Sequence, residues 1–183
     1  MYKAVLNKHK EPINKRRCGF ETGGCFAAGT LVHTKEGLVP IEKIKVGDWV
    51  LSFPEDQRTP DRIRELNEYT YRKVTQVYAK EKQALSKVVV ANLASGNTET
   101  IFVTPNHLIW CKGRGWILVG EMDIAGDTVE TFRYGNLRVF RCFQNVDVGT
   151  VYNFEVDEYH TYYVGEEGVW VHSRCSSDKA EGR

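Results

Sequence analysis

The sequence has 183 residues, with 25 Lys and Arg against 24 Asp and Glu and a formal net charge of +1. This length suffices for one domain with a proper core or one domain with tails, and the charge balance calls for neither nucleic acid nor an anionic membrane as a partner. No apolar run is long enough to span a bilayer, and the polar, basic residues 1–18 contain no stretch of the signal-peptide type.

Strand signals dominate the sequence from residue 30 onward. Short runs rich in Val, Ile, Tyr, Phe, Trp and Thr recur, and turn residues separate them. The runs are TLVHT, DWVLSF, KVVVANL, TIFVTP, HLIWC, LRVFRCF, VYNFEV, TYYVG and VWVHS. Because Gly and Asn accept a positive φ, SGN at 95–97 and YGN at 134–136 are predicted hairpin turns. The sequence therefore predicts an all-β fold.

One segment interrupts this pattern of strands. PEDQRTPDRIRELNEY, residues 54–69, is charged, contains two prolines and carries one short helical period. We interpret it as an exposed insertion with room for a helical turn.

The sequence also contains an internal repeat. GDWVLSF and GDTVETF each follow an apolar stretch, and they share Gly-Asp-x-Val-x-(Ser/Thr)-Phe. The alternative is chance recurrence of a common β-turn, but four matches at one constant offset favour a duplicated unit. The period is too long for a solenoid and indicates one domain built from two similar halves. The aligned residues are Gly47, Asp48, Val50 and Phe53 in the first copy and Gly126, Asp127, Val129 and Phe132 in the second.

The stretch GGCFAAGT singles out one cysteine as a candidate nucleophile. Cys25 directly follows Gly23 and Gly24, which indicates that the backbone before it takes a shape that a side chain would block. Attack of the thiol on the Gly24 carbonyl would give a thioester and a free amine. This step needs a base for the thiol, a donor for the oxyanion and an acid for the departing nitrogen. A small buried core residue is the alternative interpretation of Cys25.

Two further segments carry polar residues suited to such chemistry. VTPNHLIW places Thr104 and His107 three apart at a strand end, where a hydroxyl and an imidazole that titrates near neutrality can approach one peptide bond. The closing segment VYNFEVDEYHTYYVGEEGVWVHS contains His160, His172 and Ser173. His107 is alternatively an ordinary strand histidine with a satisfied hydrogen bond, and packing is an equal alternative for His160.

Metal ligation is a weak interpretation of the cysteines and histidines. The five cysteines include no C-x-x-C pair, and the five histidines include no H-x-x-x-H pair. We therefore expect neither a metal nor a cofactor. The odd number of cysteines means that at least one is free or pairs outside the chain.

Taken together, these motifs resemble the Hint (Hedgehog/intein) superfamily, and within it the bacterial intein-like and pretoxin-Hint domains of large bacterial toxin proteins. The resemblance rests on the opening cysteine, Thr-x-x-His, a Tyr-Asn-x-x-Val strand with a later histidine, and the final Val-His. It implies a pseudo-twofold β horseshoe that brings both ends to one site. The domain would span 25–173, between an N-terminal flank, 1–24, and a C-terminal flank, 174–183, that begins a downstream passenger.

The resemblance also implies roles at the N-terminal junction. Cys25 would be the nucleophile of an N–S acyl shift at the Gly24–Cys25 bond, which Thr104 and His107 would activate. Asn153 stands where relatives often carry an aspartate, so hydrogen bonding is expected of it rather than proton transfer.

At the C-terminal junction the sequence departs from the family pattern. Self-cleaving members end in His-Asn, whose side-chain nitrogen attacks its own carbonyl. His160 and His172 would serve this junction, but Ser173 has no amide nitrogen and cannot form a succinimide. Arg174 is not the Cys, Ser or Thr that splicing needs as an acceptor. Cleavage of the Asn-dependent kind is therefore expected to be disabled.

The expected function is a single-turnover rearrangement of the chain's own peptide bond, followed by cleavage by water or an external thiol. Its partners would be its flanking polypeptides and that acyl acceptor, with no nucleic acid and no membrane. The resemblance implies a secreted or cell-surface bacterial parent, from which a C-terminal toxin module is released. Three alternatives remain open: Hedgehog-like transfer to a small alcohol or amine, an inert spacer domain, and a cysteine protease acting in trans with Cys25 and His107 as a dyad.

Overall fold

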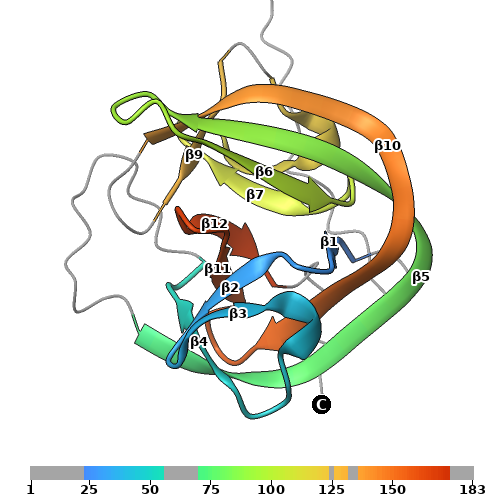
Figure 1. Cartoon of the computed structure of the whole chain (residues 1–183). Coiled ribbons are helices and arrows are strands. Elements are labelled where there is room, and N and C mark those ends of the chain that lie inside the picture. The colour runs from blue at the N-terminus through green and yellow to red at the C-terminus, as the bar shows by residue number, and fades with distance from the viewer. Residues whose placement is uncertain (1–22, 56–69, 124–125, 132–135, 174–183) are drawn as a thin grey trace, which may run out of the picture.

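The computed structural model describes residues 23–55, 70–123, 126–131 and 136–173, and these residues form β-strands with two short 3₁₀ turns (Figure 1). No α-helix occurs in these ranges, so the predicted all-β class is confirmed. Apart from Pro54 and Glu55, the predicted charged insertion lies outside the described residues. The elements are β1 (Phe26–Ala27), β2 (Leu31–Thr34), β3 (Gly37–Pro40), η1 (Ile41–Lys43), β4 (Trp49–Ser52), β5 (Thr70–Asn92), β6 (Thr98–Val103), β7 (Leu108–Cys111), β8 (Gly115–Leu118), η2 (Val119–Glu121), β9 (Thr128–Glu130), β10 (Asn136–Val156), β11 (Thr161–Val164) and β12 (Val169–His172).

Two long antiparallel strands, β5 and β10, form the frame of the molecule and curve side by side around its outside (Figure 1). The sequence pattern predicted LRVFRCF and VYNFEV as separate strands, whereas the structure joins them in β10. Shifts in register, one of them between Phe143 and Asp147, take up the polar residues between the two runs. Main-chain pairing continues through such bulges because it does not depend on side-chain hydropathy.

The internal repeat corresponds to two structurally similar halves. In the first, η1 precedes β4, and the carbonyl of Asp48 accepts the N–H of Val74 at 2.9 Å. In the second, η2 precedes β9, and the carbonyl of Asp127 accepts the N–H of Val139 at 2.9 Å. Each aspartate side chain also accepts a main-chain N–H from the turn before it. The duplication predicted from the sequence is therefore present in the fold; Phe132 lies outside the described residues.

The core is built mainly from β-branched side chains of nearly every strand, as expected where pleated surfaces pack on one another. A second cluster is aromatic and includes Phe53, Trp110, Tyr163 and Trp170. Successive residues of β11 point to opposite sides, since Tyr162 packs in the main core and Tyr163 in the aromatic cluster. The predicted SGN turn is confirmed by Gly96, which has a φ of 76° between β5 and β6.

The strands nearest the two ends of the domain are enclosed within this frame. β1 is inserted between two other strands, because Phe26 pairs with Tyr152 of β10 and with Val103 of β6. β12 pairs with β11 and β7, and in Figure 1 both β1 and β12 lie inside the curve of β5 and β10. The fold therefore brings the start and the end of the domain toward one place.

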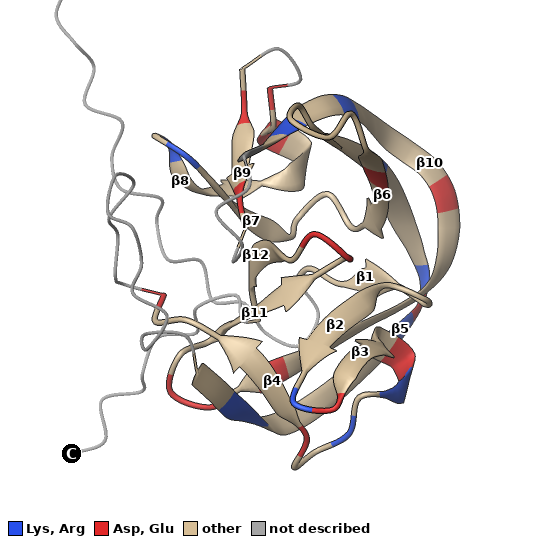
Figure 2. Ribbon diagram, turned by 60° about the vertical axis from the view of Figure 1, so that its left-hand side comes forward, with Lys and Arg blue, Asp and Glu red and all other residues tan. Residues whose placement is uncertain are grey.

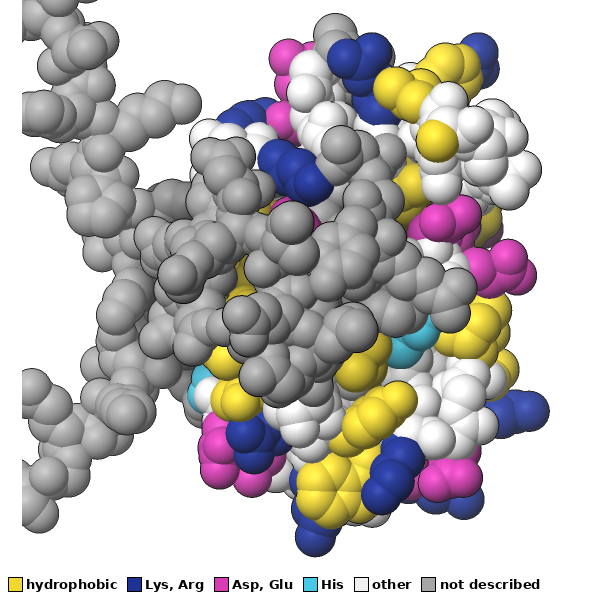
Figure 3. All heavy atoms as spheres, turned by 90° about the vertical axis from the view of Figure 1, so that its left-hand side faces the viewer, with side chains coloured by type: hydrophobic (Ala, Val, Ile, Leu, Met, Phe, Trp, Pro, Cys, Tyr) yellow, Lys and Arg dark blue, Asp and Glu magenta, His cyan; other side chains and the backbone are white. Residues whose placement is uncertain are grey.

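In the ribbon of Figure 2, Lys and Arg residues are interspersed with Asp and Glu residues along the chain. Exposed apolar side chains form several separate groups on the face shown in Figure 3. The exposed ring of Trp49 has the ammonium groups of Lys73 and Lys35 at 5.1 and 5.9 Å from its centre. Among the described residues, none forms a helix with the length and apolar character needed to cross a membrane.

The two halves give a matched test of a buried turn contact. Asp127 is 3% exposed, and its two oxygens accept hydrogen bonds from Arg114 at 2.8 and 2.6 Å, whereas the equivalent Asp48 caps a more exposed turn. Asp127→Ala is expected to lower the free energy of unfolding by about 2–3 kcal/mol, because Arg114 and the Asp123 N–H lose a buried, charged acceptor. Asp48→Ala should cost about 0.5–1 kcal/mol. Urea titration measures both, and equal losses would contradict this account.

Candidate active site

Thr104 and Cys25 are joined by a reciprocal pair of hydrogen bonds. The Cys25 N–H donates to the Thr104 hydroxyl at 2.9 Å, and the Thr104 N–H donates to the Cys25 carbonyl at 2.9 Å. Thr104 directly follows β6, and β6 pairs with β1, so the sheet itself sets this geometry. The hydroxyl therefore lies against the nitrogen of the Gly24–Cys25 peptide bond.

Asn153 contacts the other side of the same peptide unit. Its Nδ2 donates to the Gly24 carbonyl oxygen at 2.6 Å. Asn153 lies on β10, is 8% exposed, and belongs to the strand with which β1 pairs. The amide nitrogen and the carbonyl oxygen of one peptide unit are thus both held by side chains.

Residue 24 must be glycine, because its backbone passes close to His107. A Cβ at residue 24 would lie 2.3 Å from the His107 Cα and 2.6 Å from its Nδ1, far inside van der Waals contact. At Gly23, by contrast, a Cβ would meet nothing within 4 Å. The expectation that a side chain would block the backbone before Cys25 is confirmed, and the blocked residue is Gly24.

His107 is a neutral imidazole in this site. It is 2% exposed, and its ring lies 4.2 Å from that of Phe26. Burial lowers the pKa of His107 to about 3; a contact with the Gly24 backbone acts in the opposite direction, and the nearby His172 lowers the pKa further. The sequence-based expectation that this imidazole titrates near neutrality is therefore wrong, since desolvation disfavours its charged form.

Cys25 is a buried, protonated thiol. It is 3% exposed, and its sulfur lies 3.7 Å from the carbonyl oxygen of Gly23. Burial raises the pKa of Cys25 to about 11, although the positive charge of Lys80 acts in the opposite direction. The sulfur points back along the chain toward the Gly23 carbonyl, but it is not ionised in advance.

The C-terminal and N-terminal junctions both contact the side-chain amide of Asn153. Asn153 Nδ2, which contacts Gly24, also lies 3.3 Å from the Ser173 carbonyl oxygen. Ser173 is held in addition by its N–H, which donates to the His160 carbonyl at 2.8 Å, and by its hydroxyl, which accepts the N–H of Val156 at 3.3 Å. One side chain therefore touches both predicted junctions.

The two histidines of the closing segment have different surroundings. His172 Nε2 lies 2.5 Å from a carboxylate oxygen of Glu55, and its ring meets the edge of Trp116 at 5.1 Å. His160 contacts the junction through its main-chain carbonyl, and its backbone has a positive φ of 55°. The His160 Nδ1 is buried without a hydrogen-bond partner among the described residues. Arg174 lies outside the described residues.

Glu55 is a residue that sequence reasoning missed. It falls within 54–69, which the composition marked as an exposed insertion, and it is 39% exposed. Its contact with His172 links residues far apart in the chain, and no local motif signals such a contact. A carboxylate placed beside a histidine fixes the orientation of the ring.

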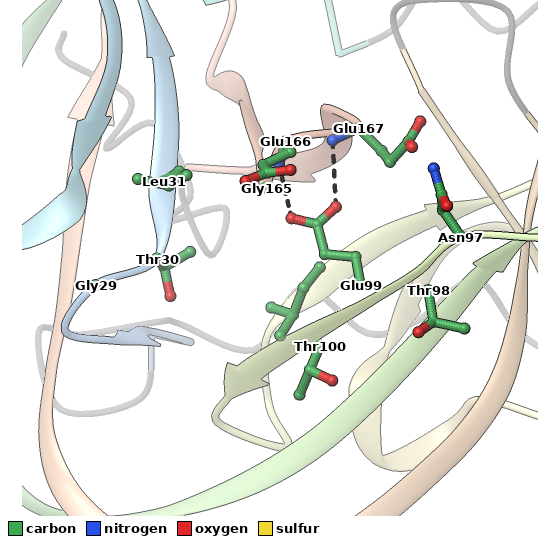
Figure 4. Close-up of a pocket in the computed structure, with 11 residues that line it drawn as sticks. Gly29, Thr30, Leu31, Asn97, Thr98, Glu99, Thr100, Gly165, Glu166 and Glu167 are labelled. Atoms are coloured by element: carbon green, nitrogen blue, oxygen red, sulfur yellow. Dashed lines mark hydrogen bonds between the residues drawn. The ribbon is translucent and has the colours of Figure 1, made fainter.

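The turn between β11 and β12 is anchored to the rest of the sheet, which places the strand that leads to Ser173. The Glu99 carboxylate accepts the N–H groups of Glu166 at 2.6 Å and Glu167 at 3.2 Å (Figure 4). His33 Nε2 lies 2.7 Å from the Gly165 carbonyl, so its role is structural. Burial raises the pKa of Glu99. The pocket of about 480 Å³ at this turn contains none of the junction residues.

The remaining cysteines and carboxylates show no arrangement that points to a metal. In the described part of the chain, no three His, Cys, Asp or Glu side chains are grouped so as to hold an ion. Cys111 and Cys142 are free, and burial raises the pKa of both thiols, that of Cys111 to about 12.

Comparison with known proteins identifies the same kind of domain. The family model described as a pretoxin HINT domain matches residues 31–174. A bacterial intein-like domain from Clostridium thermocellum is 32% identical, with a TM-score of 0.66 over 81% of this chain and 97% of that one. A search of curated proteins found no match.

Two inteins show the same fold at lower identity. The DnaB intein from Synechocystis sp. PCC 6803 is 15% identical, with a TM-score of 0.64 over 82% of this chain and 99% of that one. The gp41-1 intein is 20% identical, with a TM-score of 0.62 over 82% of this chain and 98% of that one. The chain therefore belongs to the pretoxin Hint family and is an intein-like domain of the autoprocessing type.

Proposed function

We propose that this domain breaks its own Gly24–Cys25 bond by an N–S acyl shift. The proposal rests on two hydrogen bonds to the Gly24–Cys25 peptide unit: its N–H donates to Thr104, and its carbonyl accepts from Asn153. The sulfur of Cys25 lies on the upstream side of the same unit. An acyl shift needs an attacking thiol, an oxyanion donor and a group that acts on the leaving nitrogen, and these three residues supply one group for each role.

The chemistry balances within these residues. The Cys25 sulfur forms a bond to the Gly24 carbonyl carbon, and the carbonyl oxygen gains negative charge against the Asn153 N–H. The carbon–nitrogen bond then breaks, and the thiol proton ends on the Cys25 nitrogen. The His107 ring lies against Gly24, and since burial disfavours its charged form, it would pass this proton on rather than hold it. In the resting site the Thr104 hydroxyl accepts a hydrogen bond from the Cys25 nitrogen. As a lone pair develops on that nitrogen, the hydroxyl can turn and donate to it.

Burial has opposite effects on the two main participants. It keeps Cys25 protonated, so only a small fraction of thiolate exists near neutral pH. It also removes water from around the Asn153 donor, where a single oxyanion hydrogen bond typically contributes about 10²–10³ in rate. A slow, single-turnover reaction fits this balance, since each molecule has to react only once.

Water or an external thiol would then cleave the thioester and release the N-terminal segment, residues 1–24. The flanking polypeptides are its own substrates, and Ser173 provides no nitrogen for cleavage of the Asn-dependent kind at the other end. The family description supports a toxin precursor as the parent protein. A protease acting in trans is disfavoured, because Cys25 is 3% exposed and held against its own chain.

Cys25→Ala should abolish cleavage at residue 24, because it removes the atom that attacks. The wild-type protein, incubated with a small thiol or hydroxylamine, is expected to give fragments 1–24 and 25–183 by intact mass. An adduct of another small alcohol or amine on the 1–24 fragment would identify Hedgehog-like transfer. Equal cleavage of wild type and Cys25→Ala would refute the proposal, and no cleavage of either would leave the inert spacer as the function.

Gly24→Ala should slow cleavage by about 10²-fold, because the new Cβ would overlap His107 and displace the junction from its hydrogen bonds. Gly23→Ala is the matched control, since a Cβ there meets no atom within 4 Å. Its rate should stay close to that of the wild type. Cleavage rates by mass spectrometry and melting temperatures for both variants separate a local effect from unfolding. Equal rates in the two variants would contradict the assigned geometry.

Ser173→Asn should introduce cleavage after residue 173, because an asparagine amide nitrogen can close a five-membered imide on its own carbonyl. The Asn153 amide already lies 3.3 Å from that carbonyl. Ser173→Leu is the control, because leucine is similar in size to asparagine but has no side-chain nitrogen. This variant should not be cleaved after residue 173. Mass spectrometry locates the cut. An intact C-terminus in Ser173→Asn would show that this half of the site is not assembled, and a wild-type cut one residue earlier would identify the serine hydroxyl as a nucleophile.

A further inference from the structure

The direction in which the Asn153 amide faces decides what it can do. With Nδ2 toward the junctions, it donates to the Gly24 and Ser173 carbonyls, as the structure shows. With the amide reversed, Oδ1 would face two carbonyl oxygens and repel them, and it could not stabilise an oxyanion. Some other group must therefore hold this amide in its productive orientation.

Two donors meet the Oδ1 of Asn153. One is the main-chain N–H of the next residue, Phe154, at 2.8 Å, and the other is the hydroxyl of Tyr162, at 2.9 Å. The Phe154 N–H is local to β10, whereas the tyrosine comes from β11, in the hairpin that ends at the C-terminal junction. Both donors act on the oxygen, so both favour the orientation in which Nδ2 faces the carbonyls.

The Tyr162 side chain is itself rigidly held. It is fully buried, its ring lies 4.2 Å from that of Phe154, and its edge contact with Phe26 has a centre-to-centre distance of 6.2 Å. Its backbone pairs with Val171 of β12. Burial holds the pKa of Tyr162 well above its usual range, so the hydroxyl keeps its proton near neutral pH.

We propose that Tyr162 is the positioning residue of the junction site: its hydroxyl holds the Asn153 amide in the orientation that donates to both junction carbonyls. The proposal rests on the proposed function for its role in the reaction. The placement of the amide, however, can be measured without any reaction. Tyr162 also couples the two ends, because it ties the β11–β12 hairpin to the side chain that polarises the Gly24 carbonyl.

The first test is the rate of thiol-induced cleavage at residue 24. Tyr162→Phe removes only the hydroxyl and should slow cleavage about tenfold, the effect of one lost hydrogen bond on the transition state. Tyr163→Phe is the matched control, since Tyr163 is equally buried but packs in the aromatic cluster on the opposite side of β11. It should cleave at the wild-type rate. Wild-type kinetics in Tyr162→Phe, or equal slowing in the control, would overturn the proposal.

In a second test, Tyr162→Phe is expected to accelerate cleavage instead of slowing it, a reversal that a merely structural role would not give. In Asn153→Asp the carboxyl can donate to Gly24 only when protonated, so its rate relative to wild type should fall as pH rises. The Tyr162 hydroxyl favours the ionised carboxylate. Adding Tyr162→Phe to Asn153→Asp should therefore move this fall to higher pH and accelerate cleavage at a fixed pH above the original midpoint. A further loss of rate at every pH, with no shift of the midpoint, would overturn the proposal.

The third measurement keeps the proposal separate from the chemistry. In ¹⁵N-labelled Cys25→Ala protein, which stays intact, the Asn153 side-chain amide protons are assigned by their disappearance in Asn153→Asp. They should be protected from solvent exchange, and adding Tyr162→Phe should reduce this protection roughly tenfold. Unchanged protection would refute the positioning role even if cleavage occurs. Reduced protection without wild-type cleavage would support the positioning role and refute the proposed function.

Discussion

The whole arrangement depends on one amide group that two distant parts of the chain must reach. The Nδ2 of Asn153 contacts the carbonyl of Gly24 at one end of the domain and that of Ser173 at the other. These residues can meet only because β1 is inserted beside β10 and β12 is enclosed by the curved frame. Loss of either strand from the sheet would leave the amide with one junction instead of two, so pairing of β1 and β12 and assembly of the site are one event.

The dryness of the site determines which chemical states its groups can adopt. Desolvation lowers the pKa of His107 to about 3 and raises that of Cys25 to about 11, so both groups are neutral in the resting protein. A site of neutral groups avoids the large cost of buried unpaired charge. The same exclusion of water strengthens the hydrogen bond from Asn153 once charge develops on the Gly24 oxygen.

Duplication explains how such a site arises from a small fold. Each half consists of a hairpin, a 3₁₀ turn, a further turn held by an aspartate side chain, a short strand and part of a long strand. The second half carries His107 at its start, and the first half begins directly after the junction, so each half delivers a residue to the pseudo-twofold centre. The long strands are shared between the halves, and this sharing makes the two lobes one cooperative unit rather than two domains.

Local patterns in the sequence determined the strand class, the duplicated unit and the candidates Cys25, Thr104 and His107, because alternation, turn residues and short motifs act over a few neighbouring positions. They also marked Gly24 as a constrained backbone position. Only the tertiary structure decided that His107 is neutral, that Glu55 meets His172 and that Tyr162 holds Asn153. The physical reason is the same in each case: burial and contacts between residues far apart in the chain exist only after the sheet has closed, and no stretch of sequence encodes them by itself.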